Sequence, residues 1–162
     1  ITLTSTGTET TVNVFGSGDL ALTALNASVT TLNAAAFTGN LTAATGANTA
    51  ATTITTGSGN DTVTAEAAVA YTVDLGAGND VFQTSDAAGE LTIADSIKGG
   101  DGTDTLVIVS AEAAALDDGT AADTAVLAKV VGFEELRIRS SNTRLQLCRS
   151  NNCSRCRSHI DS

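Results

Sequence analysis

The sequence has no methionine, proline or tryptophan, and only five of its 162 residues are aromatic. Basic residues are also few, with 8 Lys and Arg against 18 Asp and Glu and a formal net charge of −10. This balance excludes an ordinary nucleic-acid-binding protein, which needs a basic surface. No stretch approaches the ~20 consecutive apolar residues of a membrane-spanning helix. Because the chain begins with Ile1 rather than methionine, we expect it to be a fragment of a longer protein.

Small residues take the place of the missing large ones. Ala and Thr occur 27 times each and together make up one third of the chain, and Gly adds 15. A large aromatic or leucine-rich core is therefore excluded. We expect the fold to gain its stability from many small, regularly repeated contacts.

The composition changes abruptly near residue 137. Residues 1–136 hold 17 acids and two Lys without any Arg or Cys, whereas residues 137–162 hold six Arg, one Asp, all three Cys and the only His. One interpretation of this tail is a zinc site, because thiolates and imidazole suit zinc. Its ligands would be Cys148, Cys153, Cys156 and His159. The other interpretation is a frameshift that begins near Arg139, since GC-rich Ser, Cys and Arg codons read as Ala when shifted by one base. The DNA of the parent gene distinguishes the two.

Three segments share the pattern G-x-G-[N/T]-D-x-U, in which U is a large apolar residue. They are Gly57–Val63, Gly76–Phe82 and Gly100–Leu106, and Gly16–Leu20 is a degenerate fourth copy. Glycine permits the positive φ of a tight turn, and Asn and Asp tolerate left-handed backbone and bond their own backbone. The pattern therefore predicts a turn followed by a strand whose apolar residue points inward.

The spacing of apolar residues predicts a coil of short strands. Strand centres near Val63, Val73, Phe82 and Ile93 follow one another at steps of 10, 9 and 11 residues, and a looser rhythm runs upstream. Such spacing is typical of a parallel solenoid with two strands and roughly 18 residues per coil. We therefore predict an all-β fold, a parallel β-roll or β-helix. Its segments would be Ala/Thr-rich repeats over residues 1–56, Gly/Asp repeats over 57–109, a helical insertion and closing strand over 110–138, and the anomalous tail over 139–162.

The insertion has the features of two short helices. Ser110 is expected as the N-cap of the first, with Glu112 in its first turn. Gly119 would end that helix, and a second amphipathic helix is predicted over 121–131. The chain would then return to a strand over 133–138.

The glycine–aspartate segments resemble the nonapeptide repeats of RTX proteins, which form a calcium-binding parallel β-roll. Together with the insertion and the Ala/Thr-rich repeats, they also resemble bacterial surface-layer proteins and large secreted adhesins, over about residues 12–138. The resemblance implies Ca²⁺ held between turns of adjacent coils by hard oxygen ligands. The carboxylates would be Asp61, Asp80 and Asp104, and the carbonyls would come from Gly57, Gly59, Gly76, Gly78, Gly100 and Gly102.

The alternative is a set of turns that bind no metal, because turn geometry alone favours Gly and Asx. The chain departs from the RTX spacing of 18 residues: Asp61 to Asp80 is 19 and Asp80 to Asp104 is 24, which leaves the pairing of the third motif open. The opposite edge, around residues 66–70 and 86–90, lacks the double glycine. The excess of acids favours bound cations. Four nearby acids would lie on the surface or contribute: Asp74, Asp86, Asp95 and Asp101.

The sequence offers no catalytic constellation, so we expect a protein that is not an enzyme. The first functional hypothesis is a calcium-folded structural segment of an extracellular bacterial surface-layer protein or adhesin. Its partners would be calcium, lattice neighbours or further copies of itself, and cell-surface polysaccharide, with no nucleic acid and no membrane span. The alternative is an RTX secretion and folding module of an exported enzyme or toxin. A solenoid face that binds glycan or ice ranks last, because Thr52, Thr53, Thr55 and Thr56 keep no strict array.

Overall fold

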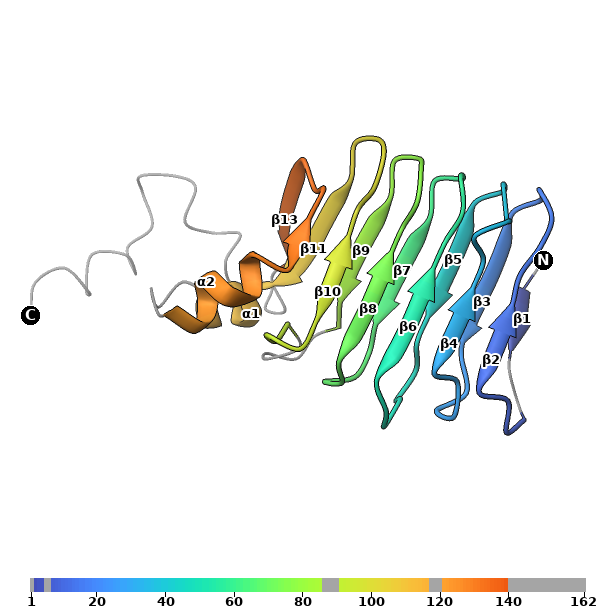
Figure 1. Ribbon diagram of the computed structural model, residues 1–162, viewed down its shortest axis with the longest axis horizontal. Helices are drawn as coiled ribbons and strands as arrows, with labels where there is room; N and C mark the ends of the chain where they lie inside the picture. Colours follow the sequence, from blue (N-terminus) through green and yellow to red (C-terminus); the bar gives the residue numbers. More distant parts are fainter. Residues whose placement is uncertain (1, 5–6, 86–90, 117–120, 140–162) are drawn as a thin grey trace, which may run out of the picture.

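The computed structural model describes residues 2–4, 7–85, 91–116 and 121–139, which form thirteen strands and two short helices (Figure 1). The strands are β1 (Thr2–Thr4), β2 (Thr11–Asn13), β3 (Leu20–Ala24), β4 (Thr31–Asn33), β5 (Leu41–Ala44), β6 (Thr52–Thr55), β7 (Thr62–Ala65), β8 (Tyr71–Asp74), β9 (Val81–Thr84), β10 (Ser96–Lys98), β11 (Thr105–Val109), β12 (Val130–Val131) and β13 (Glu135–Arg139), and the helices are α1 (Ser110–Ala115) and α2 (Ala121–Leu127). Apart from Arg139, the whole tail, with its candidate zinc ligands, lies outside the described residues, as do Gly119 and Asp86.

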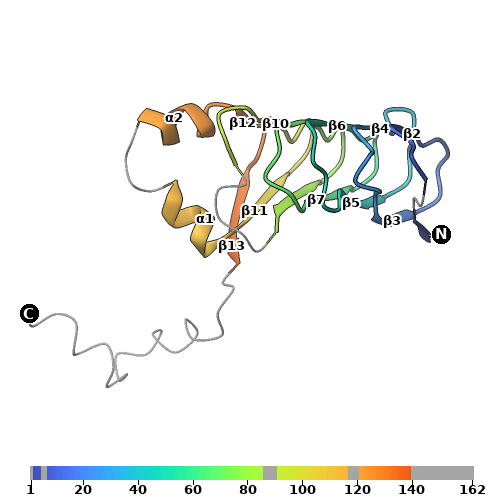
Figure 2. The ribbon, with the colours of Figure 1, turned by 90° about the horizontal axis from the view of Figure 1, so that it is seen from below.

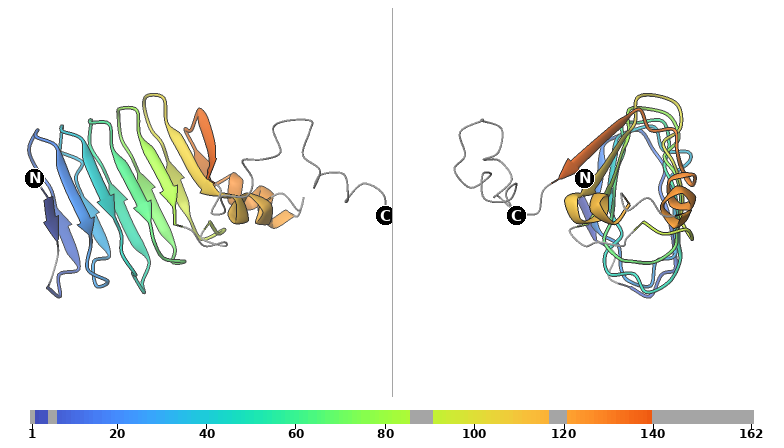
Figure 3. Two further views of the ribbon diagram at one scale, coloured as in Figure 1. Left: turned by 180° about the vertical axis from the view of Figure 1, so that it is seen from behind. Right: turned by 90° about the vertical axis from the view of Figure 1, so that its left-hand side faces the viewer.

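The chain coils around one axis, and successive strands alternate between two parallel sheets. Sheet A has the order β1-β3-β5-β7-β9-β11-β13, and sheet B has the order β12-β10-β8-β6-β4-β2. Viewed end-on, the coils overlie one another (Figure 3). The predicted class, an all-β parallel solenoid with a short helical insertion, is confirmed. The same two sheets run through the expected segments 1–56 and 57–109 without interruption.

A thin core lies between the two sheets. Alternate residues of each short strand point inward, because successive side chains of a strand face opposite sides. In sheet B the register aligns the inward residues Leu32, Ile54, Val73 and Ile97, which are at most 1% exposed. In sheet A, Val63 aligns with Phe82, and both are fully buried. Each core side chain therefore packs against its counterparts one coil before and one coil after.

Coil length varies, and most of the variation lies at one edge of the solenoid. The three connections that carry the Gly–Asp motifs each have six residues, 56–61, 75–80 and 99–104, and they lie at the upper edge in Figure 1. At the opposite edge, the connections after β7 and β9 have five and eleven residues, 66–70 and 85–95. Register partners are consequently 19 residues apart between β7 and β9 and 24 apart between β9 and β11. The expected 18-residue coil is too short.

One predicted strand centre is wrong. Ile93 lies in the long connection after β9 and is 63% exposed. The strand lies four residues further on, where Ile97 is fully buried and in register with Val73. Ile93 stands nearest to the expected spacing, but the longer connection brings Ile97 into the core instead.

The helical insertion lies between β11 and β12 at the C-terminal end of the solenoid (Figure 2). The prediction that Ser110 is the N-cap is wrong, because Ser110 is the first residue of α1. Val109 takes the cap position, and no side-chain cap bond forms there. The second helix ends at Leu127 rather than extending to 131, because Val130 and Val131 join sheet B. No helix in the described part of the chain is long and apolar enough to cross a membrane.

Strand β13 continues the core register without being covered. Leu136 and Ile138 pair with the buried Leu106 and Ile108 of β11, yet they are 61% and 58% exposed. Their side chains occupy core positions at the end of the described solenoid, which is therefore open on this side.

The stacked core predicts a large difference between adjacent residues of one strand. Replacing Ile54 by Ala should lower the free energy of unfolding by about 2–5 kcal/mol, because it leaves a cavity between two coils. The matched control Thr53→Ala, at the exposed neighbouring position, should cost less than about 1 kcal/mol. Urea unfolding followed by far-UV circular dichroism measures both. Equal losses in the two variants would contradict this packing.

Candidate functional site

The three Gly–Asp turns stack directly on one another at one edge of the solenoid. A Cβ atom added to Gly78 would lie 2.1 Å from the carbonyl oxygen of Gly59, and one added to Gly102 would lie 1.7 Å from that of Gly78. Both residues also have positive φ, 139° and 142°. Glycine is therefore required there by space as well as by conformation. The first motif differs, because positive φ occurs at neither Gly57 nor Gly59.

Backbone hydrogen bonds join neighbouring turns. The Gly57 carbonyl accepts from the Ala77 N–H at 2.9 Å, and the Gly76 carbonyl accepts from the Asp101 N–H at 2.9 Å. The Gly78 N–H donates to the Asp101 carbonyl at 2.8 Å. Two of the six carbonyls expected as calcium ligands are thus also acceptors between coils. A carbonyl oxygen has two lone pairs, so one such bond leaves capacity for a second partner.

The three predicted carboxylates lie in one buried column, here called the acid ladder: Asp61, Asp80 and Asp104, with exposed fractions of 1%, 1% and 0%. Each accepts a hydrogen bond from the backbone of the preceding coil. Asp61 Oδ1 accepts from the Leu41 N–H at 2.7 Å, Asp80 Oδ1 from the Asp61 N–H at 2.7 Å, and Asp104 Oδ1 from the Asp80 N–H at 2.8 Å. The third motif is therefore paired with the second despite the 24-residue step.

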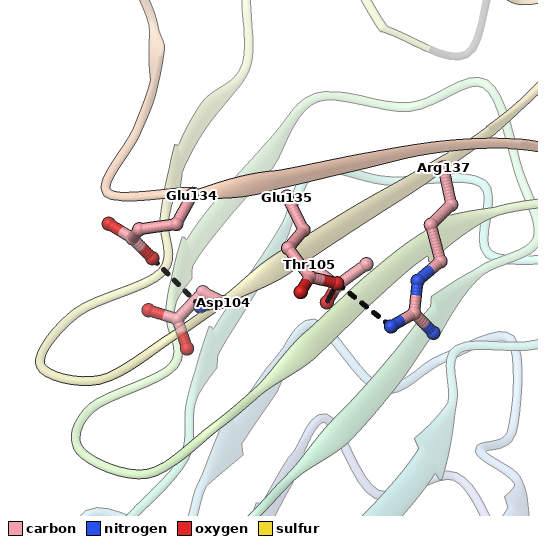
Figure 4. A network of polar contacts seen from close by, with 5 residues as sticks. All are labelled: Asp104, Thr105, Glu134, Glu135 and Arg137. Atoms are coloured by element: carbon pink, nitrogen blue, oxygen red, sulfur yellow. Dashed lines mark hydrogen bonds and ion pairs between the residues drawn. The ribbon is translucent and has the colours of Figure 1, made fainter.

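Glu134 ends the acid ladder, a role that sequence reasoning missed. Its Oε2 accepts from the Asp104 N–H at 2.8 Å, as an Asp of a further motif would do (Figure 4). Next to it, Glu135 accepts from the Thr105 hydroxyl and pairs with Arg137 at 2.8 Å. The signal in the sequence was faint, because Glu134 follows Gly132 without the second glycine of the motif.

The second carboxylate oxygens of the acid ladder are the unusual feature of the site. Asp61 Oδ2 accepts from the Gly57 N–H of its own turn at 3.3 Å. Asp80 Oδ2 and Asp104 Oδ2 are buried and have no hydrogen-bond partner. A buried charged acceptor left unsatisfied costs more than the about 1–3 kcal/mol of a neutral one. A hydrogen-bond donor or a cation beside these two atoms would remove this cost.

Burial disfavours the charged forms of Asp61 and Asp80. Desolvation, together with the charges of Asp61 and Asp104, raises the pKa of Asp80 to about 7 against the lowering effect of the hydrogen bond from the Asp61 N–H. Desolvation also raises the pKa of Asp61 above its ordinary value. The central carboxyl group is thus poised to change its protonation state near neutral pH.

A second, exposed column runs beside the acid ladder and points the other way along the axis. Asn40 Oδ1 accepts from the Asn60 N–H at 2.8 Å, Asn60 Oδ1 from the Asn79 N–H at 2.8 Å, and Asn79 Oδ1 from the Thr103 N–H at 3.0 Å. Asp19 of the degenerate fourth motif belongs to this column, because its Oδ1 accepts from the Asn40 N–H at 3.2 Å.

The main role of these Asn and Asp side chains differs from the expected one. They were expected to tolerate left-handed backbone and to bond their own turn. Among the described residues only glycines have positive φ. Apart from the bond between Asp61 and the Gly57 N–H, the Asp side chains of the acid ladder bind the backbone of the preceding coil, and the Asn side chains bind that of the following coil. The motif thus identified the Asn and Asp residues of the turns. It did not predict their hydrogen-bond partners, because these depend on how the coils stack.

The other acids near the motifs have separate places. Asp74 and Asp101 are exposed, and Asp74 lies 4.0 Å from Lys98. Asp95 is not a surface acid but is buried near the opposite edge. There it accepts from the Tyr71 N–H at 2.7 Å and from the Thr92 N–H at 2.6 Å. It is a structural acceptor away from the acid ladder.

The acid ladder fits a hard cation in its chemistry. All its potential metal ligands are carboxylate oxygens, and two of these oxygens are buried without a hydrogen-bond partner. Ca²⁺ prefers oxygen ligands of this kind. The carboxylates are spread one per coil, and no group of three or more His, Cys, Asp or Glu in the described ranges gathers around one point. A cation at this edge would therefore bridge coils and depend on turn carbonyls for most of its ligands.

Comparison with known proteins adds no relative: no family model, curated protein or solved structure matches the chain. The fold and the site define it as a parallel β-solenoid whose coils are joined at one edge by stacked glycine turns and by Asx side-chain ladders.

The raised pKa of Asp80 predicts how stability depends on pH without metal. Between its ordinary value of 3.8 and about 7, the folded chain binds a proton that the unfolded chain does not. The free energy of unfolding should therefore fall as pH rises through this interval, in proportion to the difference in bound protons. Asp80→Asn should flatten the profile and be more stable than the wild type at pH 8. Urea unfolding in chelator from pH 4 to 8 tests this.

The matched control is Asp101→Asn, in the same kind of turn but exposed. It should keep the slope of the wild-type profile. A wild-type stability that rises between pH 4 and 7, or a D80N profile as steep as the wild type, would show that Asp80 does not titrate in this way.

Proposed function

We propose that this chain is a calcium-stabilised structural segment of a protein exported to the bacterial cell surface, of the kind found in surface layers and large adhesins. The observation that carries the proposal is the pair of buried, unpartnered oxygens Asp80 Oδ2 and Asp104 Oδ2 beside the stacked turns. A divalent cation would satisfy both atoms and offset the repulsion along the acid ladder. No enzymatic role enters this proposal.

The ligands would be those expected from the motifs. The carboxylates are Asp61, Asp80 and Asp104, and the carbonyls are those of Gly57, Gly59, Gly76, Gly78, Gly100 and Gly102. Ca²⁺ takes six to eight oxygen ligands in flexible geometry, so carbonyls from two adjacent turns can complete its shell. When bound, the ion supplies positive charge between coils. The chain itself supplies the register that brings one carboxylate per coil to the same edge.

Charge and environment support a role outside the cell. Residues 1–136 carry 17 acids and two Lys, so the chain repels itself unless cations gather on it. Extracellular calcium fills sites as weak as ~10⁻⁴–10⁻³ M, whereas cytosolic calcium does not. The proposal therefore makes folding a consequence of export, because an ion that binds only the folded chain stabilises it.

The open end of the solenoid supports the expectation of neighbours. The inward side chains of Leu136 and Ile138 are exposed in β13, and the backbone groups along the outer edge of that strand can pair with another strand. A further coil or a second molecule would bury both. Assembly end to end suits a structural protein of the cell surface.

Calcium should stabilise the chain through the acid ladder. At a free concentration of 100 times the dissociation constant, one site should add about 2.7 kcal/mol to the free energy of unfolding. We expect this gain with Ca²⁺ and little with Mg²⁺, which demands a more rigid octahedral shell. The variant Asp80→Asn/Asp104→Asn should lose it, and the exposed control Asp101→Asn should keep it. Urea unfolding with chelator, Ca²⁺ or Mg²⁺ measures the difference.

Competition with protons sharpens this test. Ca²⁺ binds the ionised carboxylates, so its stabilising effect should be greater at pH 8 than at pH 5. Equal stabilisation by calcium in the double variant and the wild type would mean that any bound calcium lies elsewhere. No stabilisation of the wild type by Ca²⁺ at pH 8 would contradict the proposal that the acid ladder binds calcium.

A further inference from the structure

The outward face of sheet B carries a row of hydroxyl side chains in exact register. Strand pairing aligns one residue from each of β2, β4, β6, β8 and β10. This threonine row consists of Thr11, Thr31, Thr53, Thr72 and Ser96. Thr11, Thr53 and Thr72 are exposed, and the other two are half-buried. An array of hydroxyl groups thus extends along the solenoid axis.

A second row lies two residues further along the same strands. It consists of Asn13, Asn33, Thr55, Asp74 and Lys98. Within it the Asn33 side-chain amide donates to Asn13 Oδ1 at 3.3 Å, so neighbouring side chains of the row hold one another. The two rows together make a grid with two polar residues per strand.

The grid is regular because the core beneath it is fixed. The residue between the two row positions of each strand points inward. In β4, β6 and β8 these residues are Leu32, Ile54 and Val73, which are at most 1% exposed. Neighbouring strands lie ~4.8 Å apart, and residues two apart along a strand are separated by ~6.6 Å. Sheet B forms a nearly straight side of the solenoid (Figure 2). Threonine is also stiff at χ1, so its hydroxyl and methyl groups repeat with the backbone.

The chemistry of the grid excludes most kinds of partner. None of its ten residues is aromatic, and the two charged ones, Asp74 and Lys98, lie 4.0 Å from each other at one end. A protein interface is usually anchored by Trp, Tyr or Arg, which are missing from the two rows. Sugar rings also find no aromatic face to stack on. Apart from this charged pair, the grid consists of uncharged groups that both donate and accept hydrogen bonds.

We propose that the outward face of sheet B binds the surface of ice. A ligand that contacts identical protein groups at a fixed spacing must itself repeat at a fixed spacing. A crystal surface does so, whereas a single small molecule does not. Each threonine hydroxyl donates and accepts hydrogen bonds as a water molecule does. The methyl group beside each hydroxyl offers water molecules no second hydrogen-bond partner. The inference is independent of the proposed calcium sites, because it rests on sheet B rather than on the glycine edge.

Growth of ice crystals in the presence of the full chain tests this proposal. We expect the wild type to slow recrystallisation in a frozen sucrose solution, and Thr53→Lys to lose most of that effect, because a long charged side chain breaks the middle of the row. Thr42→Lys is the matched control: Thr42 is an exposed threonine within a strand of sheet A. It should keep the wild-type effect.

Thr31→Lys, one strand away from Thr53, gives a second variant should T53K fold poorly, and circular dichroism checks every variant. A wild type that leaves crystal growth unchanged would overturn the proposal. So would equal loss in T42K and in the folded sheet B variants. Co-sedimentation with microcrystalline cellulose or chitin that is lost in T53K, without any effect on ice, would replace ice by a crystalline polysaccharide.

Discussion

The structure depends on the contact of each coil with the coil before and after it. Parallel strands stack at ~4.8 Å, so each residue has its counterparts one coil away as nearest neighbours. A side chain is acceptable only if it can be repeated, or complemented, at that distance. Gly78 meets the Gly59 carbonyl where a Cβ atom would not fit, and Ile54 packs between Leu32 and Val73. Stability then arises as a sum of neighbour interactions, as in other solenoids.

The acid ladder is where this constraint is most costly. Stacking places Asp80 between Asp61 and Asp104, and all three are buried. Their backbone hydrogen bonds hold the coils in register, which is a structural gain. The same placement gathers like charge away from water and raises the pKa of Asp80 to about 7. A structure that needs carboxylates for register and cannot hydrate them becomes sensitive to protons and cations. Sensitivity to its ionic surroundings is thus built into the way the solenoid is joined.

The sequence predicted the class of fold and the residues of the acid ladder, because both depend on local patterns. Alternating apolar residues and repeated Gly–Asp motifs indicate strands and turns without any knowledge of long-range contacts. The misplaced strand centre depended on coil length. Ile93 stood at the expected spacing, but an eleven-residue connection made Ile97 the core residue. The threonine row stayed hidden for the same reason, since Thr31, Thr53 and Thr72 are separated by 22 and 19 residues and show no fixed period.

The connections at the two edges of the solenoid differ in how much their length varies. The three Gly–Asp turns keep six residues each, and both the Asp and the Asn ladders run through them. The opposite edge carries the longest connections, those after β9 and β11, which have eleven and twenty residues, 85–95 and 110–129. Insertions are therefore accommodated where they disturb neither the core register nor the outward rows. This explains how Thr72 and Ser96 stay in register across a 24-residue step. Turns of constant length in the three motifs thus accompany connections of variable length at the other edge, and the faces between them remain in register.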